Sequence, residues 1–326
     1  MRDRFKMRPV TMNDLGDIVD LANTASLTDL GKPETSLEKK RAELESGDID
    51  IERDCRIVHD GSGLVTGYIE LWNSPPYTRP TAWGCVHPEY CGLGIGSSLV
   101  TWAQTHAGSM TDKAPAGKRV AFQVYSPASN HRALRMFSDN GLSRVRCFLR
   151  MRIDMEKETR PDAPILPDGI LIRPFRPGIE EKPLYRTMQE AFSDHWDHVD
   201  ISFETWLDSY TTNFHYDPTA LFIAVDNRNG QEEIIGGSLC YPATSEEDGC
   251  AYVEDLGVLK PWRRRGIALA LLQHTFREFH GREIYSVELY VDSENPTGAT
   301  GLYEKAGMRT VRRTDLYERE IRSGKD

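Results

Sequence analysis

A strand-to-helix loop that could bind an anion occurs twice in the chain. The second copy is Val258-Leu259-Lys260-Pro261-Trp262-Arg263-Arg264-Arg265-Gly266-Ile267-Ala268, and the first is Val86-His87-Pro88-Glu89-Tyr90-Cys91-Gly92-Leu93-Gly94-Ile95-Gly96. Such a turn presents unpaired backbone N–H groups at the start of a helix, where the helix dipole also favours negative charge. Three arginines make the second loop strongly cationic, whereas the first has Cys91, Gly92 and Leu93 there. These residues predict a site for a few phosphate groups.

The elements that hold the two loops form a repeat. Val86 aligns with Val258, and Gly141 aligns with Gly307. In the second half, apolar periodicity predicts strands over 221–225, 234–240, 251–258, 287–291 and 308–320, with helices over 269–279 and 297–306. In the first half it predicts helices over 95–107 and 130–140 and a strand over 120–125. We expect an α/β (α+β) protein with domains at residues 1–155 and 170–326, joined by a charged, proline-containing linker at 156–169.

Composition narrows the function further. With 39% hydrophobic and 28% charged residues among 326, and no long apolar run, the chain reads as a soluble protein without a membrane span. No apolar stretch follows the basic start, so we expect no secretory signal and a cytoplasmic location. The six cysteines include no C-x-x-C pair, which argues against disulfides and a metal site. A formal charge of -10 argues against nucleic acid as a partner.

Two spaced motifs connect these observations to a family. The order of elements, with Arg263-x-x-Gly266-x-Ala268 followed by Asn295-x-x-x-Ala299-x-x-x-Tyr303-x-x-x-Gly307, resembles the GCN5-related N-acetyltransferase (GNAT) superfamily and its Q/R-x-x-G-x-G/A signature. The doubled arrangement resembles the two-domain, mycothiol synthase-like members. A dinucleotide-binding turn would need G-x-G-x-x-G, but Ser97 stands at the third glycine position. The resemblance implies two tandem domains, each with a mixed, mostly antiparallel central sheet flanked by helices.

The resemblance implies acetyl-CoA as co-substrate. Backbone N–H groups of residues 264–268 would hold the pyrophosphate, with added charge from Arg263 and Arg265. The backbone of the preceding strand would pair with the pantetheine amides, and Asn295 would hydrogen-bond the cofactor or simply cap a helix. The predicted cofactor-binding residues are Leu256, Val258, Arg263, Arg264, Arg265, Gly266, Ile267, Ala268 and Asn295.

Acetyl transfer to an amine needs a base for the ammonium and an acid for the leaving thiolate. Tyr303 stands where the family places its acid, although a tyrosine packed in the core would look the same. Glu254 stands where many members carry the base, with a surface carboxylate as the alternative. Tyr252 occupies a position that often holds a second glutamate. The expected substrate pocket contains His195, Trp196, His198 and Tyr252, between two helical stretches within residues 180–210.

The first half departs from the family pattern at the chemical positions. The replacements, with the second-half residue in parentheses, are Cys91 (Arg263), Phe137 (Tyr303), Ser129 (Asn295) and Ala82 (Glu254). Phenylalanine cannot donate a proton, but the glycines of the loop remain. We therefore expect a degenerate domain with a possible vestigial CoA site at Val86, Gly92, Gly94, Ile95 and Gly96.

These observations predict an acetyl-CoA-dependent N-acetyltransferase. The second domain would transfer acetyl directly to a primary amine of a small molecule, with no metal. The alternatives are a protein or peptide N-acetyltransferase and a non-catalytic acyl-CoA sensor. Pairing of the two halves as an internal pseudo-dimer would make a monomer sufficient, and a homodimer is the other option.

Overall fold

The chain forms two compact units that do not follow the order of the sequence. The computed structural model describes residues 4–33, 35–45, 49–196, 198–213, 215–244, 249–295 and 297–324. The N-terminal unit comprises Met1–Cys147 together with Arg313–Asp326, and the C-terminal unit comprises Phe148–Arg312. Boundaries at residues 155 and 170 were expected, so the division of the chain differs from the prediction.

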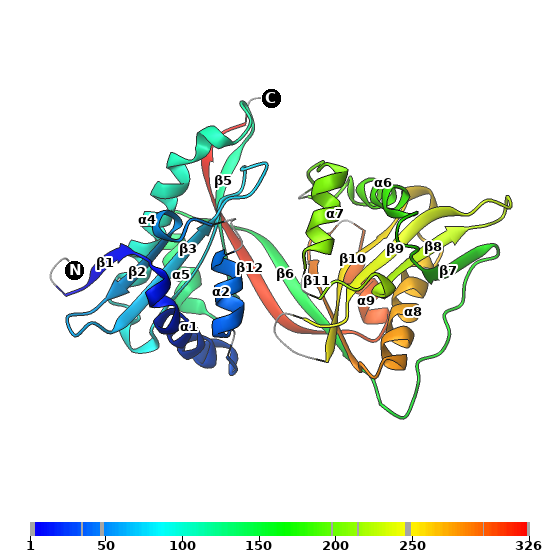
Figure 1. Cartoon of the computed structure of the whole chain (residues 1–326), viewed down its shortest axis with the longest axis horizontal. Coiled ribbons are helices and arrows are strands. Elements are labelled where there is room, and N and C mark those ends of the chain that lie inside the picture. Colours follow the sequence, from blue (N-terminus) through cyan, green and yellow to red (C-terminus); the bar gives the residue numbers. More distant parts are fainter. Residues whose placement is uncertain are drawn as a thin grey trace. The chain divides into compact units, whose positions relative to one another are not determined.

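An exchange of final strands explains the difference. β6 (Ser143–Asp154) begins in the first half of the sequence but pairs with β11 (Ser286–Asp292) of the C-terminal unit. β12 (Arg309–Arg322) ends the chain but pairs with β5 (Val120–Pro127) of the N-terminal unit, where the red strand runs beside β5 in Figure 1. Period-two alternation reveals a strand but not the sheet that it joins.

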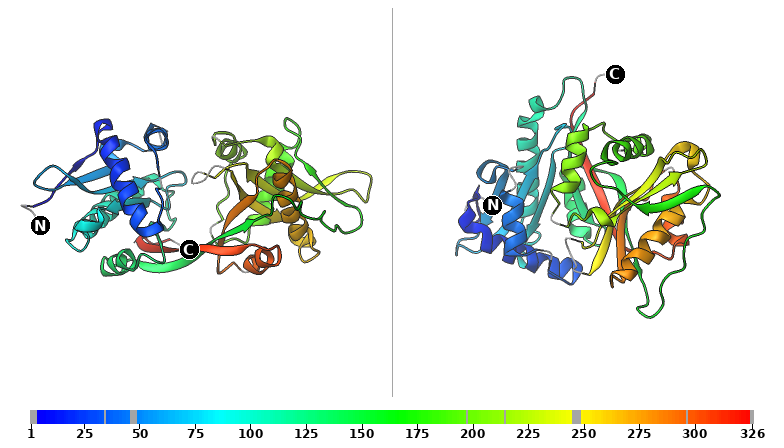
Figure 2. Two further views of the ribbon diagram at one scale, coloured as in Figure 1. Left: turned by 90° about the horizontal axis from the view of Figure 1, so that it is seen from below. Right: turned by 45° about the vertical axis from the view of Figure 1, so that its right-hand side comes forward.

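The N-terminal unit is a mixed sheet with helices on both faces (Figures 1 and 2). Its strands, in spatial order, are β1 (Lys6–Pro9), β2 (Cys55–His59), β3 (Val65–Trp72), β4 (Thr81–Val86), β5 and β12. The pairing of β4 with β5 is parallel, and the other pairs are antiparallel. The helices are α1 (Leu15–Leu30), α2 (Leu37–Glu45), α3 (Ile51–Asp54), α4 (Ile95–Ser109) and α5 (His131–Asp139). One core packs α1 against the sheet and another packs α4 and α5.

The C-terminal unit repeats this plan. Its strands, in spatial order, are β6, β11, β10 (Cys250–Val258), β9 (Glu233–Tyr241), β8 (Leu221–Asp226) and β7 (Ile170–Pro174). The β10–β11 pair is parallel, and the other described pairs of neighbouring strands in this unit are antiparallel. The helices are α6 (Glu181–Phe192), α7 (Phe203–Thr211), α8 (Ile267–Gly281) and α9 (Ala299–Lys305). The cores place α6 and α7 on one face of the sheet, and α8 and α9 on the other. The predicted fold class is thus confirmed.

A buried ion pair attaches the exchanged strand β6 to the C-terminal unit. Arg150 and Glu288 are 5% and 2% exposed and form a salt bridge across β6 and β11. Arg152 Nη1 lies 3.1 Å from the other carboxylate oxygen of Glu288. Two cations thus compensate one buried carboxylate, and both come from the first half of the sequence.

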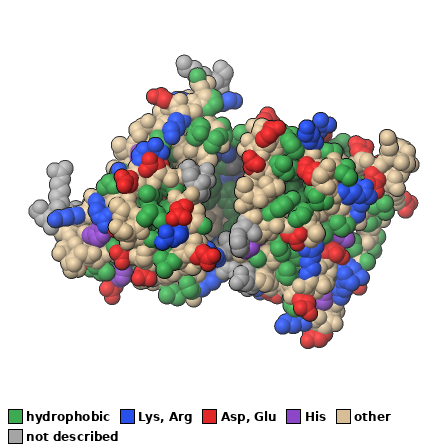
Figure 3. Space-filling model, in the orientation of Figure 1, with side chains coloured by type: hydrophobic (Ala, Val, Ile, Leu, Met, Phe, Trp, Pro, Cys, Tyr) green, Lys and Arg blue, Asp and Glu red, His purple; other side chains and the backbone are tan. Residues whose placement is uncertain are grey.

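The segment expected to be a linker is held against α8. Arg277 Nη1 donates to the carbonyl oxygen of Pro161 at 2.6 Å, and His280 Nε2 lies 3.0 Å from that of Glu156. On the face shown in Figure 3, acidic and basic side chains are interspersed on each unit. Among the described residues, no helix is both long enough and apolar enough to cross a membrane.

Candidate active site

The cationic loop of the C-terminal unit has the backbone of an anion-binding turn. Gly266 (φ 83°) precedes α8, and no side chain in the described part of the chain caps this helix start. Arg264 is also left-handed (φ 63°), which costs a non-glycine residue roughly 1–2 kcal/mol. The first copy places Gly92 (φ 82°) and Gly94 (φ 84°) in the same conformations. The turn therefore has the same backbone geometry in both units. In the C-terminal unit this geometry strains the backbone at Arg264, where the N-terminal unit has a glycine.

The guanidinium group of Arg263 forms hydrogen bonds with other residues of the protein. Its Nε donates to Val258 O at 3.1 Å and its Nη2 to Ala191 O at 2.7 Å. Its Nη1 and Nη2 bind Asp194 at 2.8 and 3.1 Å. This differs from the expectation of a direct phosphate contact by the guanidinium, because four of its five N–H directions already have partners.

The other loop residues divide between backbone and side-chain roles. Arg265 stacks on Trp262, with the guanidinium carbon 5.0 Å from the ring centre, and Arg264 Nη2 donates to Thr297 O at 3.3 Å. Ile267 is 1% exposed and packs in the core, so it can offer a ligand only its backbone. Ala268 is half-buried in the first turn of α8.

A splay between two parallel strands lies beside the loop. Pairing of β10 with β11 runs from Cys250–Ser286 to Tyr252–Glu288, whereas β10 continues to Val258. On its other edge, β10 stays paired with β9 through Leu256–Ser238 and Val258–Gly236. Beyond Tyr252 the described pairs therefore leave the β11-facing edge of β10 without a strand partner, and such an edge has backbone N–H and C=O groups that can pair with an extended ligand.

A β-bulge in β10 sets the position of Glu254. The register with β9 shifts between Val253 and Asp255, so Glu254 is the extra residue. The side chain of Glu254 is accessible to solvent, but nearby protein atoms displace part of the water around its carboxyl group. This partial desolvation, together with the neighbouring charge of Asp255, raises the pKa of Glu254 to about 7. In the N-terminal unit, β4 pairs with β3 without a shift from Val86 to Thr81, and Ala82 stands in the strand.

Asp255, which the sequence analysis did not single out, completes a carboxyl pair. It accepts a hydrogen bond from the hydroxyl of Tyr210 on α7. Burial raises its pKa. The sequence signal was its position directly after Glu254, but only the bulge places both side chains near the splay.

Tyr303 on α9 is 8% exposed and packs in the core with Leu289 of β11. Burial, and then the charge of Asp255, raise its pKa, so its hydroxyl stays protonated at neutral pH. The same burial suits a core residue, so both interpretations in the sequence analysis stay open. Its counterpart Phe137 packs on Tyr317 of β12, with ring centres 5.6 Å apart.

Asn295 and His195, predicted separately, lie in contact. Asn295 Oδ1 accepts from the N–H and hydroxyl of Thr297 at 2.9 and 2.7 Å, which leaves its Nδ2 to donate to His195 Nε2 at 3.1 Å. This orientation assigns the ring proton of His195 to Nδ1. Burial lowers the pKa of His195 and favours that neutral form.

The other expected pocket residues are His198, Trp196 and Tyr252. His198 lies 3.1 Å from Asp200, and Trp196 is half-buried. Tyr252 is half-buried, with its ring 6.3 Å from that of Tyr290. Asp197, between Trp196 and His198 in the sequence, lies outside the described residues.

A similar contact occurs in the N-terminal unit. Asn130, the residue after Ser129, bonds through its Nδ2 to Asp29 of α1, whereas Asn295 bonds through its Nδ2 to His195 in the turn after α6. Asn130 donates to Asp29 at 2.6 Å.

The N-terminal unit contains a cavity of about 820 Å³ beside its own loop. Four of the five predicted vestigial residues line it: Val86, Gly92, Gly94 and Gly96. Ile95 instead is 1% exposed in the core. The cavity extends along the β4–β5 splay to Trp83 and is also lined by Asn130.

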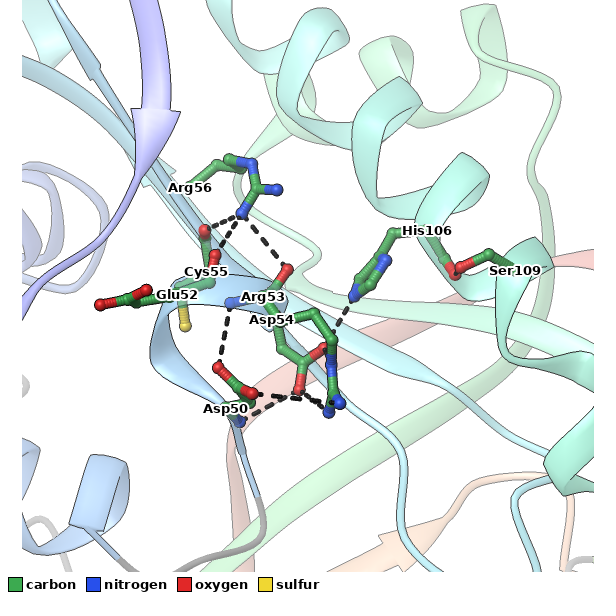
Figure 4. Close-up of polar contacts among 8 residues, drawn as sticks. All are labelled: Asp50, Glu52, Arg53, Asp54, Cys55, Arg56, His106 and Ser109. Carbon is green, nitrogen blue, oxygen red and sulfur yellow. Dashed lines mark hydrogen bonds and ion pairs between the residues drawn. The ribbon is translucent and has the colours of Figure 1, made fainter.

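A second polar cluster in the N-terminal unit contains Ser109, His106 and Asp54 but is no nucleophilic triad (Figure 4). His106 Nε2 lies 2.7 Å from Asp54 Oδ1, whereas Ser109 Oγ donates to the backbone carbonyl of His106 at 2.7 Å. A triad would need the serine on the imidazole. Over the described residues, no group of three or more His, Cys, Asp or Glu side chains is placed to hold a metal ion.

Comparisons with known proteins agree with this geometry. The Acetyltransferase (GNAT) family model matches residues 182–308. The mycothiol acetyltransferase of Streptomyces coelicolor is 30% identical over 80% of this chain and 77% of that protein. The one of Streptomyces bingchenggensis is 28% identical over 95% of this chain and 94% of that protein.

A solved structure is similar to this protein over nearly the whole chain. The GCN5-related N-acetyltransferase from Sphaerobacter thermophilus is 34% identical, has a TM-score of 0.85, and covers 99% of this chain and 98% of its own. Both repeats of the present chain are thus accounted for by one homologous structure. With its splayed strands, anion-binding turns and these relatives, the chain belongs to the GCN5-related N-acetyltransferase family, as an N-acetyltransferase with two tandem units.

Proposed function

We propose that the C-terminal unit transfers the acetyl group of acetyl-CoA directly to a primary amine of a small molecule. The observation that carries the proposal is the bulged Glu254, accessible beside the β10–β11 splay with a pKa of about 7. A carboxyl that titrates near neutral pH is matched to removing a proton from an ammonium group.

Each step has a residue of this chain behind it. Glu254 accepts a proton from the acceptor ammonium, and the free amine attacks the acetyl carbonyl carbon. The carbon–sulfur bond then breaks, and the leaving sulfur takes the proton of the Tyr303 hydroxyl. The new amide nitrogen loses its extra proton, which restores the Tyr303 hydroxyl, and Glu254 releases its proton to solvent. N–H groups of the loop before α8 hold the pyrophosphate, and the open edge of β10 pairs with the pantetheine amides.

The first acceptor to test comes from the relatives, which are named mycothiol acetyltransferases. The assay therefore tests the amine that is acetylated in mycothiol as an acceptor, together with a panel of amino sugars, amino acids and other amines. Peptides with free N-termini are tested as a second group of acceptors. Release of CoA thiol is the measurement. If no amine raises release above hydrolysis while CoA still shifts the melting temperature, the enzyme proposal fails and the acyl-CoA sensor takes its place.

We propose that the N-terminal unit binds CoA without turnover. Its cavity of about 820 Å³ includes the glycines of the first loop and Asn130, whereas Ala82 and Phe137 replace the base and the acid. The cavity therefore offers a place for CoA to bind, but residues 82 and 137 have no group that could accept or donate a proton.

A matched pair of substitutions assigns the two roles. Gly96 and Ala268 are each the second residue of the helix after a loop, where aspartate suits the helix but repels a phosphate. Ala268→Asp is expected to lower kcat/KM by at least about 100-fold, whereas Gly96→Asp keeps turnover and removes one of two CoA equivalents in calorimetry. Loss of turnover from Gly96→Asp in a folded protein would assign the chemistry to the other unit.

A further inference from the structure

The turn after α6 touches two parts of the proposed cofactor site. Asp194 binds the guanidinium of Arg263 with both carboxylate oxygens, at 2.8 and 3.1 Å. The next residue, His195, accepts from the side chain of Asn295 at 3.1 Å. One dipeptide thus meets the phosphate loop on one side and the turn before α9 on the other.

Arg263 also bonds to two backbone carbonyls, and we call its bonds to Asp194, Val258 and Ala191 the clasp. Its remaining bonds reach Val258 O, at the end of β10, and Ala191 O, in the last turn of α6. A cation at a helix C-terminus is favourable, because the carbonyls there lack helical partners. The guanidinium therefore fastens the strand end, the loop and the helix end to one another.

The charge of Asp194 is what orients the clasp. Its side chain is 34% exposed and that of Arg263 is 25% exposed, so the pair is partly shielded from water. The hydrogen bond from Arg263 holds the pKa of Asp194 at about 2, and Lys260 Nζ lies 3.8 Å away. A bidentate carboxylate fixes the plane of a guanidinium in a way that two carbonyls alone do not.

The N-terminal unit offers an internal comparison. Cys91 stands at the position of Arg263, and its thiol contacts the carbonyl of His87. Asp29, at the end of α1, is bound by Asn130 instead. The clasp on the phosphate loop therefore occurs in the unit that carries Glu254 and Tyr303.

We infer that Asp194 is a positioning residue for acetyl transfer: through Arg263 it fixes the phosphate loop of the C-terminal unit in its ligand-binding shape. The inference rests on the proposed function of that unit. Asp194 itself touches no reacting atom. Because preorganisation lowers the cost of binding without changing the chemical step, its loss should weaken acetyl-CoA binding and spare kcat.

The kinetic test compares Asp194→Asn with Asp194→Glu and with Glu190→Gln, an exposed carboxylate in the last turn of α6. Asp194→Asn is expected to raise KM for acetyl-CoA about tenfold and to leave kcat within about twofold. Asp194→Glu should recover part of the loss, and Glu190→Gln should match the wild type. In an Arg263→Lys background, Asp194→Asn should add little, because the clasp is already broken.

A second measurement does not depend on turnover. Calorimetry with CoA in a Gly96→Asp background, which isolates the C-terminal unit, should show a Kd about tenfold higher for Asp194→Asn. If CoA binds but no amine is acetylated, the proposed function fails while the positioning role is still measured. An unchanged KM and Kd, or kcat falling in step with a lower melting temperature, would overturn the inference in favour of a purely structural ion pair.

Discussion

Glu254 and Asp255 follow one another at a β-bulge, and the hydroxyl of Tyr210 donates to Asp255, the more enclosed of the two carboxyls. The bulge therefore separates two chemically identical groups into a solvent-accessible one and a hydrogen-bonded one. This division gives the proposed base its role and leads to the first prediction.

Activity should rise with pH through about 7, because Glu254 must lose its proton before it can act as a base. Glu254→Gln should lower kcat about 100- to 1,000-fold and flatten this limb of the kcat/KM profile. Asp255→Asn should move the midpoint to lower pH, since it removes the neighbouring charge. Burial is the larger cause of the shift, so the midpoint should stay above the ordinary range of a glutamate. An acidic limb that survives in Glu254→Gln would assign it to another group.

Tyr303→Phe should lower kcat about tenfold or more while KM for acetyl-CoA changes little, because the hydroxyl is needed for the leaving sulfur and not for binding. Phe137→Leu, at the counterpart position, is the control and should change only the melting temperature. If Tyr303→Phe matches the wild type, the buried tyrosine is a core residue alone.

The cluster around Asp54 should make stability depend on pH at the acidic end. Bonds from Arg53 and His106 outweigh desolvation and hold the pKa of Asp54 at about 2, below its ordinary value (Figure 4). Its contribution, on the order of 2 kcal/mol, is present above pH 4 and lost as the pH falls toward 2. Asp54→Asn should therefore lower the free energy of unfolding at pH 6 and hardly at all near pH 2, as measured in urea. The exposed Glu52→Gln should follow the wild type at both values.

The strand exchange predicts where the chain can be cut. A fragment of residues 148–312 contains the part of β6 that pairs with β11 and the other five strands of the C-terminal unit, and it should fold cooperatively, as followed by circular dichroism. A fragment of residues 156–326, cut where the sequence suggests, lacks β6 and leaves Glu288 buried without Arg150. Breaking such a buried pair costs about 3–5 kcal/mol, so this fragment should melt lower or fail to fold. Equal melting temperatures for the two fragments would contradict the exchange.

The sequence predicted the parts of the fold that depend on local pattern. The two loops, the alternation of residues 251–258 and the helix that begins at Ile267 all have signals in the chain itself. The bulge at Glu254 does not, because one extra residue in a strand leaves the composition unchanged. The partner of Arg263 was also beyond reach, since the arginine pattern is the same whether the guanidinium faces a phosphate or Asp194.

The exchanged strands also fix an order of assembly during synthesis. The ribosome makes β1 to β5 of the N-terminal unit early, yet β12, which pairs with β5, follows every strand of the C-terminal unit in the sequence. The C-terminal unit can complete its sheet once residue 312 has left the ribosome, because β6, which pairs with β11, has already been synthesised. The unit that begins first is therefore completed after the other, and a chain that ends at residue 312 would have the paired strands of the C-terminal sheet but no β12 residues to pair with β5.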